Sequence, residues 1–196
     1  NCRFVEVMIN GDYKGIYVFM ERIKRNANRV NIPKMAKTDI SGDAVTGGYI
    51  FSIDKEADGW YSGVYPPYST SGQNIRFSYI YPKLTSIVTA QQNYLKSYVD
   101  SFETVLKGDQ FQDKLTGWRK FADESSFIDY SIVNELSRNV DGYRLSAYFN
   151  KDKQSKGGKI FAGPAWDYDL AFRNANYCRG AETSGWAYQF NRDCPQ

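Results

Sequence analysis

The N-terminal part of the chain alternates between hydrophobic and polar positions with a period of two, which is typical of β-strands. Residues 3–9 and 13–20 form two such runs, and Asn10-Gly11 between them is a strong signal for a two-residue hairpin. Two more runs, 47–53 and 75–81, predict a third and a fourth strand. The hairpin makes the expected sheet antiparallel.

The period changes to 3.6 residues after the fourth strand, which predicts two helices. The first is capped by Thr85 or Ser86 and ends at Gly108. Its expected apolar face consists of Ile87, Val88, Leu95, Tyr98, Val99, Phe102, Val105 and Leu106. The second helix begins near Asp123 and loses its pattern at Asn139. It is expected to bury Phe127, Ile128, Ile132 and Leu136.

The remaining segments lack such long periodic runs. Residues 25–45 are polar, and residues 54–72 are rich in Gly, Pro, Ser and Tyr, so both are expected to be irregular. A charged turn at 151–158 separates two short strands, 145–150 and 159–162. Strands therefore come first, then helices, then a short β-hairpin, an order that predicts an α+β fold. A length of 196 residues suits one domain.

Composition narrows the possible chemistry, because the chain contains no histidine. This excludes Ser-His-Asp and Cys-His catalysis, HExxH zinc proteases and every histidine-based metal site. No Cys-x-x-Cys pair is present either, which argues against a structural zinc site. Catalysis would have to use carboxylates, Lys, Arg, Tyr and hard cations.

The charge and the cysteine content limit which partners and which cellular location are expected. A net charge of +3 without a basic block predicts no nucleic-acid partner, and no apolar run approaches the roughly 20 residues of a membrane span. Cys178 and Cys194 are close enough in sequence for a disulfide around a short loop, with Cys2 left over; three reduced thiols are the alternative. The cysteine pattern modestly favours an extracellular or cell-surface location.

Two carboxylates in the run 166–172 mark the first candidate site. On an extended backbone, Asp167 and Asp169 would point to the same face, roughly 6–7 Å apart. The residues around them are apolar or aromatic, and a buried carboxylate is costly unless it is paired, hydrogen-bonded or bound to a metal. This run is therefore expected to form a strand that carries a functional acidic pair.

A third carboxylate, Asp141, lies on the loop between the second helix and the short hairpin, and Asp167 follows directly after that hairpin. Phosphoryl transfer uses such an arrangement, in which one carboxylate orients or deprotonates a hydroxyl and another holds Mg²⁺. Hard oxygen ligands suit that ion. The alternative is that these Asp residues simply cap turns.

Three motifs together resemble the CotH kinase family, named after a spore-coat protein and related in fold to protein kinases. The first is Asn-Gly-Asp-Tyr-Lys-Gly-Ile-Tyr at 10–17, leading to Glu21. The others are Asn-Val-Asp-Gly-Tyr at 139–143 and Trp-Asp-Tyr-Asp at 166–169. They occur in the family's order, and the chain looks like the C-terminal part of that domain.

The resemblance implies a protein-kinase-like fold and Mg²⁺-dependent transfer of phosphate from ATP to Ser or Thr of a surface or secreted protein. Asp141 would accept the proton of the substrate hydroxyl, Asp167 would bind Mg²⁺ with Asp169 nearby, and Glu21 would belong to the nucleotide site. Ser146 stands where kinases place a metal-binding Asn, and its hydroxyl is a weaker ligand. Asn150 is a poor substitute.

The family's nucleotide-binding Lys would precede Asn1, so residues 1–196 are expected to form a single-domain fragment that lacks part of its N-terminal lobe. Activity of the fragment by itself is left open. Two further functions also remain open: a non-catalytic scaffold or pseudokinase with the same fold, and a carbohydrate-binding module. The aromatic side chains that suggest the latter are Trp60, Tyr61, Tyr65 and Tyr68.

Overall fold

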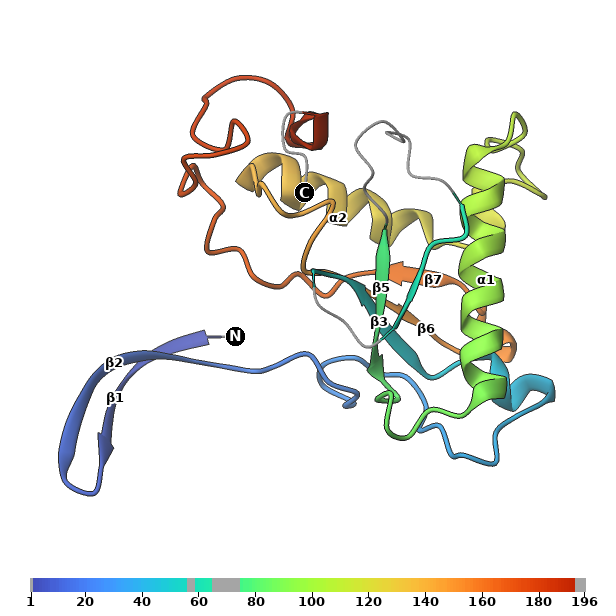
Figure 1. Ribbon diagram of the computed structural model, residues 1–196, viewed down its shortest axis with the longest axis horizontal. Coiled ribbons are helices and arrows are strands. Elements are labelled where there is room, and N and C mark those ends of the chain that lie inside the picture. Colours follow the sequence, from blue (N-terminus) through green and yellow to red (C-terminus); the bar gives the residue numbers. More distant parts are fainter. Residues whose placement is uncertain (1, 56–58, 65–74, 193–196) are drawn as a thin grey trace.

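The computed structural model describes residues 2–55, 59–64 and 75–192, and its main body is an antiparallel sheet with two helices (Figure 1). The sheet has five strands in the order β4-β5-β3-β6-β7. The strands are β3 (Tyr49–Ile53), β4 (Gly59–Tyr61), β5 (Arg76–Tyr81), β6 (Ala147–Lys151) and β7 (Ile160–Ala162). This confirms the α+β class and the antiparallel sheet, and the hairpin β6–β7 joins that sheet through β3.

Aromatic side chains on one face of the sheet form the main core. Phe51 of the central strand β3 lies opposite Phe149 of β6, with ring centroids 5.4 Å apart. Trp60 of β4 stacks on Phe77 of β5 at 5.1 Å. The helix α1 (Thr89–Lys107) adds Leu95 and other apolar residues to the same cluster. The core thus supports the strands from which the candidate site extends.

A second, two-stranded sheet, β1 (Cys2–Ile9) and β2 (Asp12–Met20), extends away from this body (Figure 1). Its turn is the predicted one, since Asn10 and Gly11 have φ values of 53° and 87°. Apolar side chains are exposed along both strands; Phe4 is 81% and Phe19 68% exposed. The first two strands therefore form a separate sheet and take no part in the main core.

The helix α1 starts later than predicted. Residues 83–87 form a turn in which the N–H groups of Ser86 and Ile87 both donate to the carbonyl of Lys83. The helix then begins at Thr89, with the backbone N–H of Val88 donating to the side chain of Gln91. The expected face is confirmed for Leu95 and Val99, which are buried, and wrong for Leu106, which is 44% exposed.

The expected buried face of α2 (Glu124–Ser137) is largely wrong. Ile128, Ile132 and Leu136 are 51%, 50% and 77% exposed, whereas Asn134 and Ser137 are buried. Phe127 does pack against the main core. The helix turns a polar side toward the loops that follow it, because hydrogen bonds with those loops satisfy its buried polar groups. One result is the burial of Asn134, whose side chain contacts the loop of the candidate site.

The two segments that were expected to be irregular contain short regular elements. The segment expected to be irregular after residue 54 contains the strand β4, and residues 56–58 and 65–74 lie outside the described residues. Short 3₁₀ helices occur at η1 (Gly42–Thr46), η3 (Trp118–Lys120), η4 (Gln154–Lys156) and η5 (Ala187–Arg192). Within the described ranges, no helix is long and apolar enough to cross a membrane.

Lys151, predicted to begin a charged turn, is instead the fully buried last residue of β6. Its ammonium group donates hydrogen bonds to the carbonyl oxygens of Thr46 and Asp152. The same group lies 4.3 Å from the ring centroid of Tyr98 and 5.2 Å from that of Tyr94. Carbonyl oxygens and aromatic faces thus surround this cation, a favourable environment for a positive charge.

Burial nevertheless lowers the pKa of Lys151 to about 8, with the negative charges of Asp152 and Asp43 opposing the shift. Between pH 8 and about 10.5, the unfolded chain holds this proton and the folded protein does not, so the free energy of unfolding rises with pH. Relative to a Lys151→Met variant, we expect the wild-type value to increase by about 3 kcal/mol across this interval.

Urea unfolding at a series of pH values measures this difference. Ionising tyrosines are common to both proteins and cancel in the comparison. The exposed Lys156 supplies a control, because a Lys156→Met variant keeps the buried cation and should follow the wild type. Parallel pH profiles for wild type and Lys151→Met would show that burial does not perturb the pKa of this amine.

Candidate functional site

The turn that carries Asp141 begins where α2 ends. Arg138 adopts a left-handed conformation, with φ of 50°, and the N–H of Asn139 donates to the carbonyl of Asn134. The carbonyl of Asp141 then accepts hydrogen bonds from the N–H groups of Arg144 and Leu145. These bonds close a tight turn, so the position of Asp141 is set by the backbone.

Side chains of α2 hold this turn against the helix. The hydroxyl of Tyr130 donates to the carbonyl of Gly142 at 2.6 Å, and that of Tyr143 donates to the carboxylate of Glu135 at 2.9 Å. A Cβ atom on Gly142 would lie 2.0 Å from Oδ1 of Asn134. Glycine is therefore required in this motif because the turn contacts Asn134 so closely.

Asp141 forms an ion pair within its own turn. Oδ1 of Asp141 accepts a hydrogen bond from the guanidinium of Arg144 at 2.7 Å, and the two side chains are 13% and 12% exposed. The pair is thus mostly shielded from water, where a charge-assisted hydrogen bond orients a carboxylate firmly. Arg144 was not singled out from the sequence, although its three-residue spacing from Asp141 is the signal that points to it.

The segment 166–172 is a loop, which contradicts the predicted strand and the predicted pairing of its carboxylates. Asp167 has φ of 61°, so the alternation of an extended chain breaks at this residue. Asp167 and Asp169 are both exposed rather than buried. The loop is held by other bonds, among them one from the N–H of Phe172 to the carbonyl of Ser137.

The two carboxylates of this loop face different neighbours. The hydroxyl of Ser146 donates to Oδ2 of Asp167 at 3.1 Å. Burial raises the pKa of Tyr148, and the charges of Asp54 and Asp167 raise it further. Asp167 therefore lies beside Ser146 and Tyr148, at the start of the hairpin β6–β7.

Asp169 lies toward the turn of Asp141. Burial is the largest cause of the raised pKa of Tyr177, and the negative charges of Asp141 and Asp169 both contribute to it. The structure thus brings Asp141 and Asp169 around one tyrosine, while Asp167 meets Ser146. Among the described residues a hydrogen bond joins Ser146 to Asp167, and the charges of Asp141 and Asp169 both act on Tyr177, but no hydrogen bond or ion pair joins these two pairs.

One buried side chain of α2, Asn134, connects the turn to the loop. Its Oδ1 accepts a hydrogen bond from the hydroxyl of Tyr168 at 2.9 Å, and its Nδ2 donates to the carbonyl of Tyr130 at 2.9 Å. Asn134 is completely buried. Sequence reasoning did not select this residue, because a lone polar position next to an apolar helical stripe normally faces solvent.

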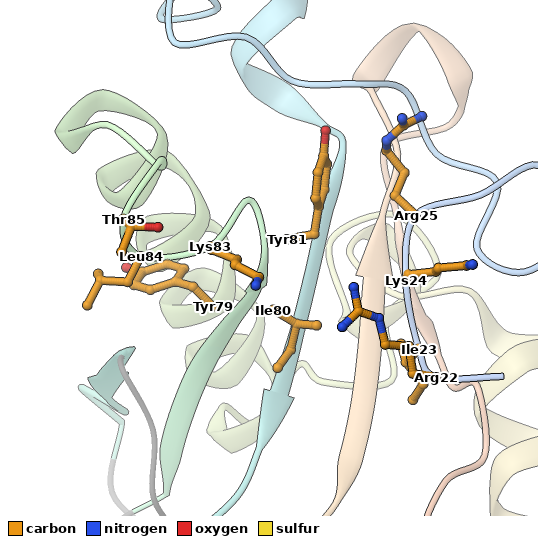
Figure 2. Close-up of a pocket in the computed structure, with 10 residues that line it drawn as sticks. All are labelled: Arg22, Ile23, Lys24, Arg25, Tyr79, Ile80, Tyr81, Lys83, Leu84 and Thr85. Carbon is orange, nitrogen blue, oxygen red and sulfur yellow. The ribbon is translucent and has the colours of Figure 1, made fainter. Parts of the chain in front are cut away.

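Glu21 does not join this group. It is exposed in the linker that follows β2, and its side chain forms no hydrogen bond or ion pair among the described residues. The predicted role of Glu21 in a nucleotide site stays a prediction. The linker beyond it, however, borders a cleft of about 600 Å³ on the β5 side of the sheet (Figure 2).

The candidate site has oxygen ligands for a metal ion, but the residues that the structure describes supply too few of them to fill its coordination shell from the protein alone. Among the described residues, no group of three or more His, Cys, Asp or Glu side chains could hold a metal ion. Asp167, Asp169 and Ser146 still supply two exposed carboxylates and a hydroxyl, and neither carboxylate has an ion-pair partner in the described part of the chain. Of these three residues, only Asp167 and Ser146 are hydrogen-bonded to each other, and this pair suits Mg²⁺, which takes one or two carboxylates and completes its shell with water and substrate phosphates.

Two other expectations can be compared with the structure. Cys178 is disulfide-bonded and Cys2 is a free, exposed thiol, while Cys194 lies outside the described residues. Trp60 is 8% exposed and belongs to the core, so it offers no platform for a sugar ring. Tyr61 is exposed, and Tyr65 and Tyr68 fall outside the described residues.

The sequence of the chain matches the model of one protein family. The chain matches the family described as CotH kinase protein over residues 1–195, and it therefore belongs to the CotH kinase family. This confirms the resemblance carried by the three motifs. Neither a curated protein nor a solved structure matches the chain.

The contact between Gly142 and Asn134 generates a prediction about stability. A Gly142→Ala change places a methyl group against Oδ1 of Asn134, and we expect the free energy of unfolding to fall by about 1–3 kcal/mol. Asn134→Ala should cost a similar amount, because it leaves the hydroxyl of Tyr168 without its acceptor.

The two changes together should cost less than their sum, because the truncated side chain at position 134 makes room for the new methyl group. Chemical unfolding of the wild type, both single variants and the double variant measures this coupling. Purely additive costs would show that the close approach does not restrict position 142.

Proposed function

We propose that this protein transfers the terminal phosphoryl group of ATP to a Ser or Thr hydroxyl of a protein acceptor, with Mg²⁺ as cofactor, on a protein-kinase-like fold. The observation that carries the proposal is the hydrogen bond from Ser146, directly before the hairpin β6–β7, to Asp167, in the loop after it, with Asp141 on the turn that follows α2. Membership of the CotH kinase family supports it.

In the proposed reaction the acceptor oxygen bonds to the γ-phosphorus, and the bond from that phosphorus to the β–γ bridging oxygen breaks, leaving ADP. The hydroxyl proton passes to the carboxylate of Asp141, which its ion pair with Arg144 holds in place. Asp167 and Asp169 would hold the magnesium ion with help from Ser146. Bound Mg²⁺ would neutralise charge on the phosphate oxygens.

The same ion pair favours a second candidate, a scaffold that binds nucleotide without transferring phosphate. Arg144 already donates a hydrogen bond to Oδ1 of Asp141, so this oxygen is occupied while the pair persists. In that case magnesium-dependent nucleotide binding would persist while no hydroxyl acceptor is phosphorylated. The disulfide at Cys178 supports an extracellular or cell-surface location for either activity.

Substitution of the carboxylates tests the proposal in the full-length protein. We expect Asp141→Asn to lower transfer from labelled ATP to casein by about a hundredfold, the scale of general-base catalysis, with nucleotide binding retained. We expect Asp167→Asn to remove magnesium-dependent nucleotide binding in calorimetry. Asp129 on α2 is exposed, and Asp129→Asn supplies a control with the same loss of charge outside the site.

Wild-type protein that binds no nucleotide in the presence of Mg²⁺ would contradict the proposal outright. Nucleotide binding without transfer to casein or other hydroxyl acceptors would select the scaffold. Equal activity of Asp141→Asn and the Asp129→Asn control would remove the assigned role from Asp141.

Ser146 allows a gain-of-function prediction. Its φ is 49°, a left-handed conformation that Asn adopts more readily than most residues. A Ser146→Asn change should therefore keep the backbone and replace a hydroxyl by an amide oxygen, a stronger magnesium ligand. We expect Mg²⁺ to support nucleotide binding at a concentration about tenfold lower, measured by calorimetry, whereas Ser146→Ala should need more. An unchanged magnesium requirement in both variants would exclude Ser146 from the metal site.

A further inference from the structure

A cation-rich cleft lies away from the carboxylates, between the linker that follows β2 and the strand β5 with its following turn (Figure 2). Its volume is about 600 Å³. Four of the ten residues that line it are cationic and none is acidic. The four are Arg22, Lys24, Arg25 and Lys83. Such a lining selects for a negatively charged occupant.

The side chains are arranged to meet an anion from two walls. Figure 2 shows Arg22 and Lys83 reaching from opposite sides toward the space over Ile80, with Lys24 turned away. The guanidinium of Arg25 lies 5.6 Å from the ring centroid of Tyr81 and borders the same cleft. The cleft therefore combines two facing cations with an apolar floor.

These cations have no acidic partner in the described part of the chain. The ion pairs found there join Lys14 to Asp12, Arg119 to Glu124, Arg144 to Asp141 and Arg179 to Glu182. Arg22, Lys24 and Lys83 are also exposed. Their charge is therefore available to a ligand, with the attraction strengthened by the low-dielectric floor.

The position of the cleft sets it beside the carboxylate site but on another strand of the sheet. Ile23 and Ile80 pack in one cluster with Tyr148 and Trp166, the residue before Asp167, so the cleft and the carboxylate site share a hydrophobic wall. In the sheet, however, β5 and β6 are separated by β3, which puts about 10 Å between them. The cleft and the loop of Asp167 therefore lie beside different strands, and the cations of the cleft can serve an anion other than the phosphates at Asp167.

We propose that this cleft binds an acidic or phosphorylated side chain of the protein acceptor, which deepens and rests on the proposed phosphoryl transfer. Arg22 can bind a carboxylate or phosphate through two parallel hydrogen bonds, and Lys83 adds a point charge from the other wall. The strands β5 and β6 are about 10 Å apart, which an extended peptide covers in about three residues, so the proposal places the anion about three residues from the target hydroxyl.

Three matched peptides test this preference, each with one Ser and with Glu, phosphoserine or Gln three residues away. We expect the full-length protein to bind the two anionic peptides about tenfold more tightly than the Gln peptide, with the difference shrinking at high salt. Fluorescence anisotropy without nucleotide measures binding, and steady-state assays give separate KM values for peptide and ATP.

Variants of the exposed cations identify the site. Arg22→Gln with Lys83→Gln should abolish the preference and leave the KM for ATP unchanged, whereas Lys37→Gln, an exposed control on the same linker, should keep it. Arg22→Glu with Lys83→Glu should transfer the preference to a peptide with Lys at that position. A merely structural role for these residues would not produce that reversal.

Several results would overturn the proposal. Equal affinity for the anionic and Gln peptides would show that the cleft does not bind an anionic side chain of the acceptor. An increase in the KM for ATP in the Gln variant, with peptide affinity unchanged, would assign the cleft to the nucleotide. Charge-dependent peptide binding without any phosphoryl transfer would instead overturn the proposed catalysis and leave the docking cleft in place.

Discussion

The buried amide of Asn134 joins the two segments on which the candidate site depends. Its oxygen accepts from Tyr168 in the loop of Asp167 and Asp169, and the same oxygen limits position 142, beside Asp141, to glycine. Because a buried polar group must be hydrogen-bonded, the helix, the turn and the loop are stable only in an arrangement that satisfies this amide. Asn134 thus contributes, together with the backbone hydrogen bonds of the turn and the loop, to the placement of the carboxylates.

This constraint also explains why α2 buries polar rather than apolar residues. Asn134 and Ser137 face the turn and the loop, and the apolar side chains of Ile132 and Leu136 remain at the surface. A fully hydrogen-bonded network favours one conformation more strictly than an apolar contact does, since any displacement leaves a group unpaired. Such rigidity suits the roles proposed for these carboxylates, which require a metal ion and a hydroxyl to be held in a fixed geometry.

Opposite charges are distributed over neighbouring parts of the sheet. Carboxylates gather after α2 and after the hairpin β6–β7, whereas Arg22 and Lys83 lie two strands away beside β5. A hydrophobic cluster that contains Ile23 and Trp166 lies at the border of both regions, and no ion pair among the described residues joins them. We propose the first region for a cation with bound phosphates and the second for an anion on the acceptor.

Local interactions made the elements predictable from the sequence. Asn10-Gly11 specifies its own hairpin, the long apolar periodicity specifies α1, and the three motifs identify the family; each depends only on residues near one another in the chain. Tertiary structure alone decided which face of α2 is buried, that the segment around Asp167 is a loop, and where the cationic cleft forms. These features depend on contacts between segments far apart in the sequence. A local sequence pattern does not predict which polar groups form those contacts.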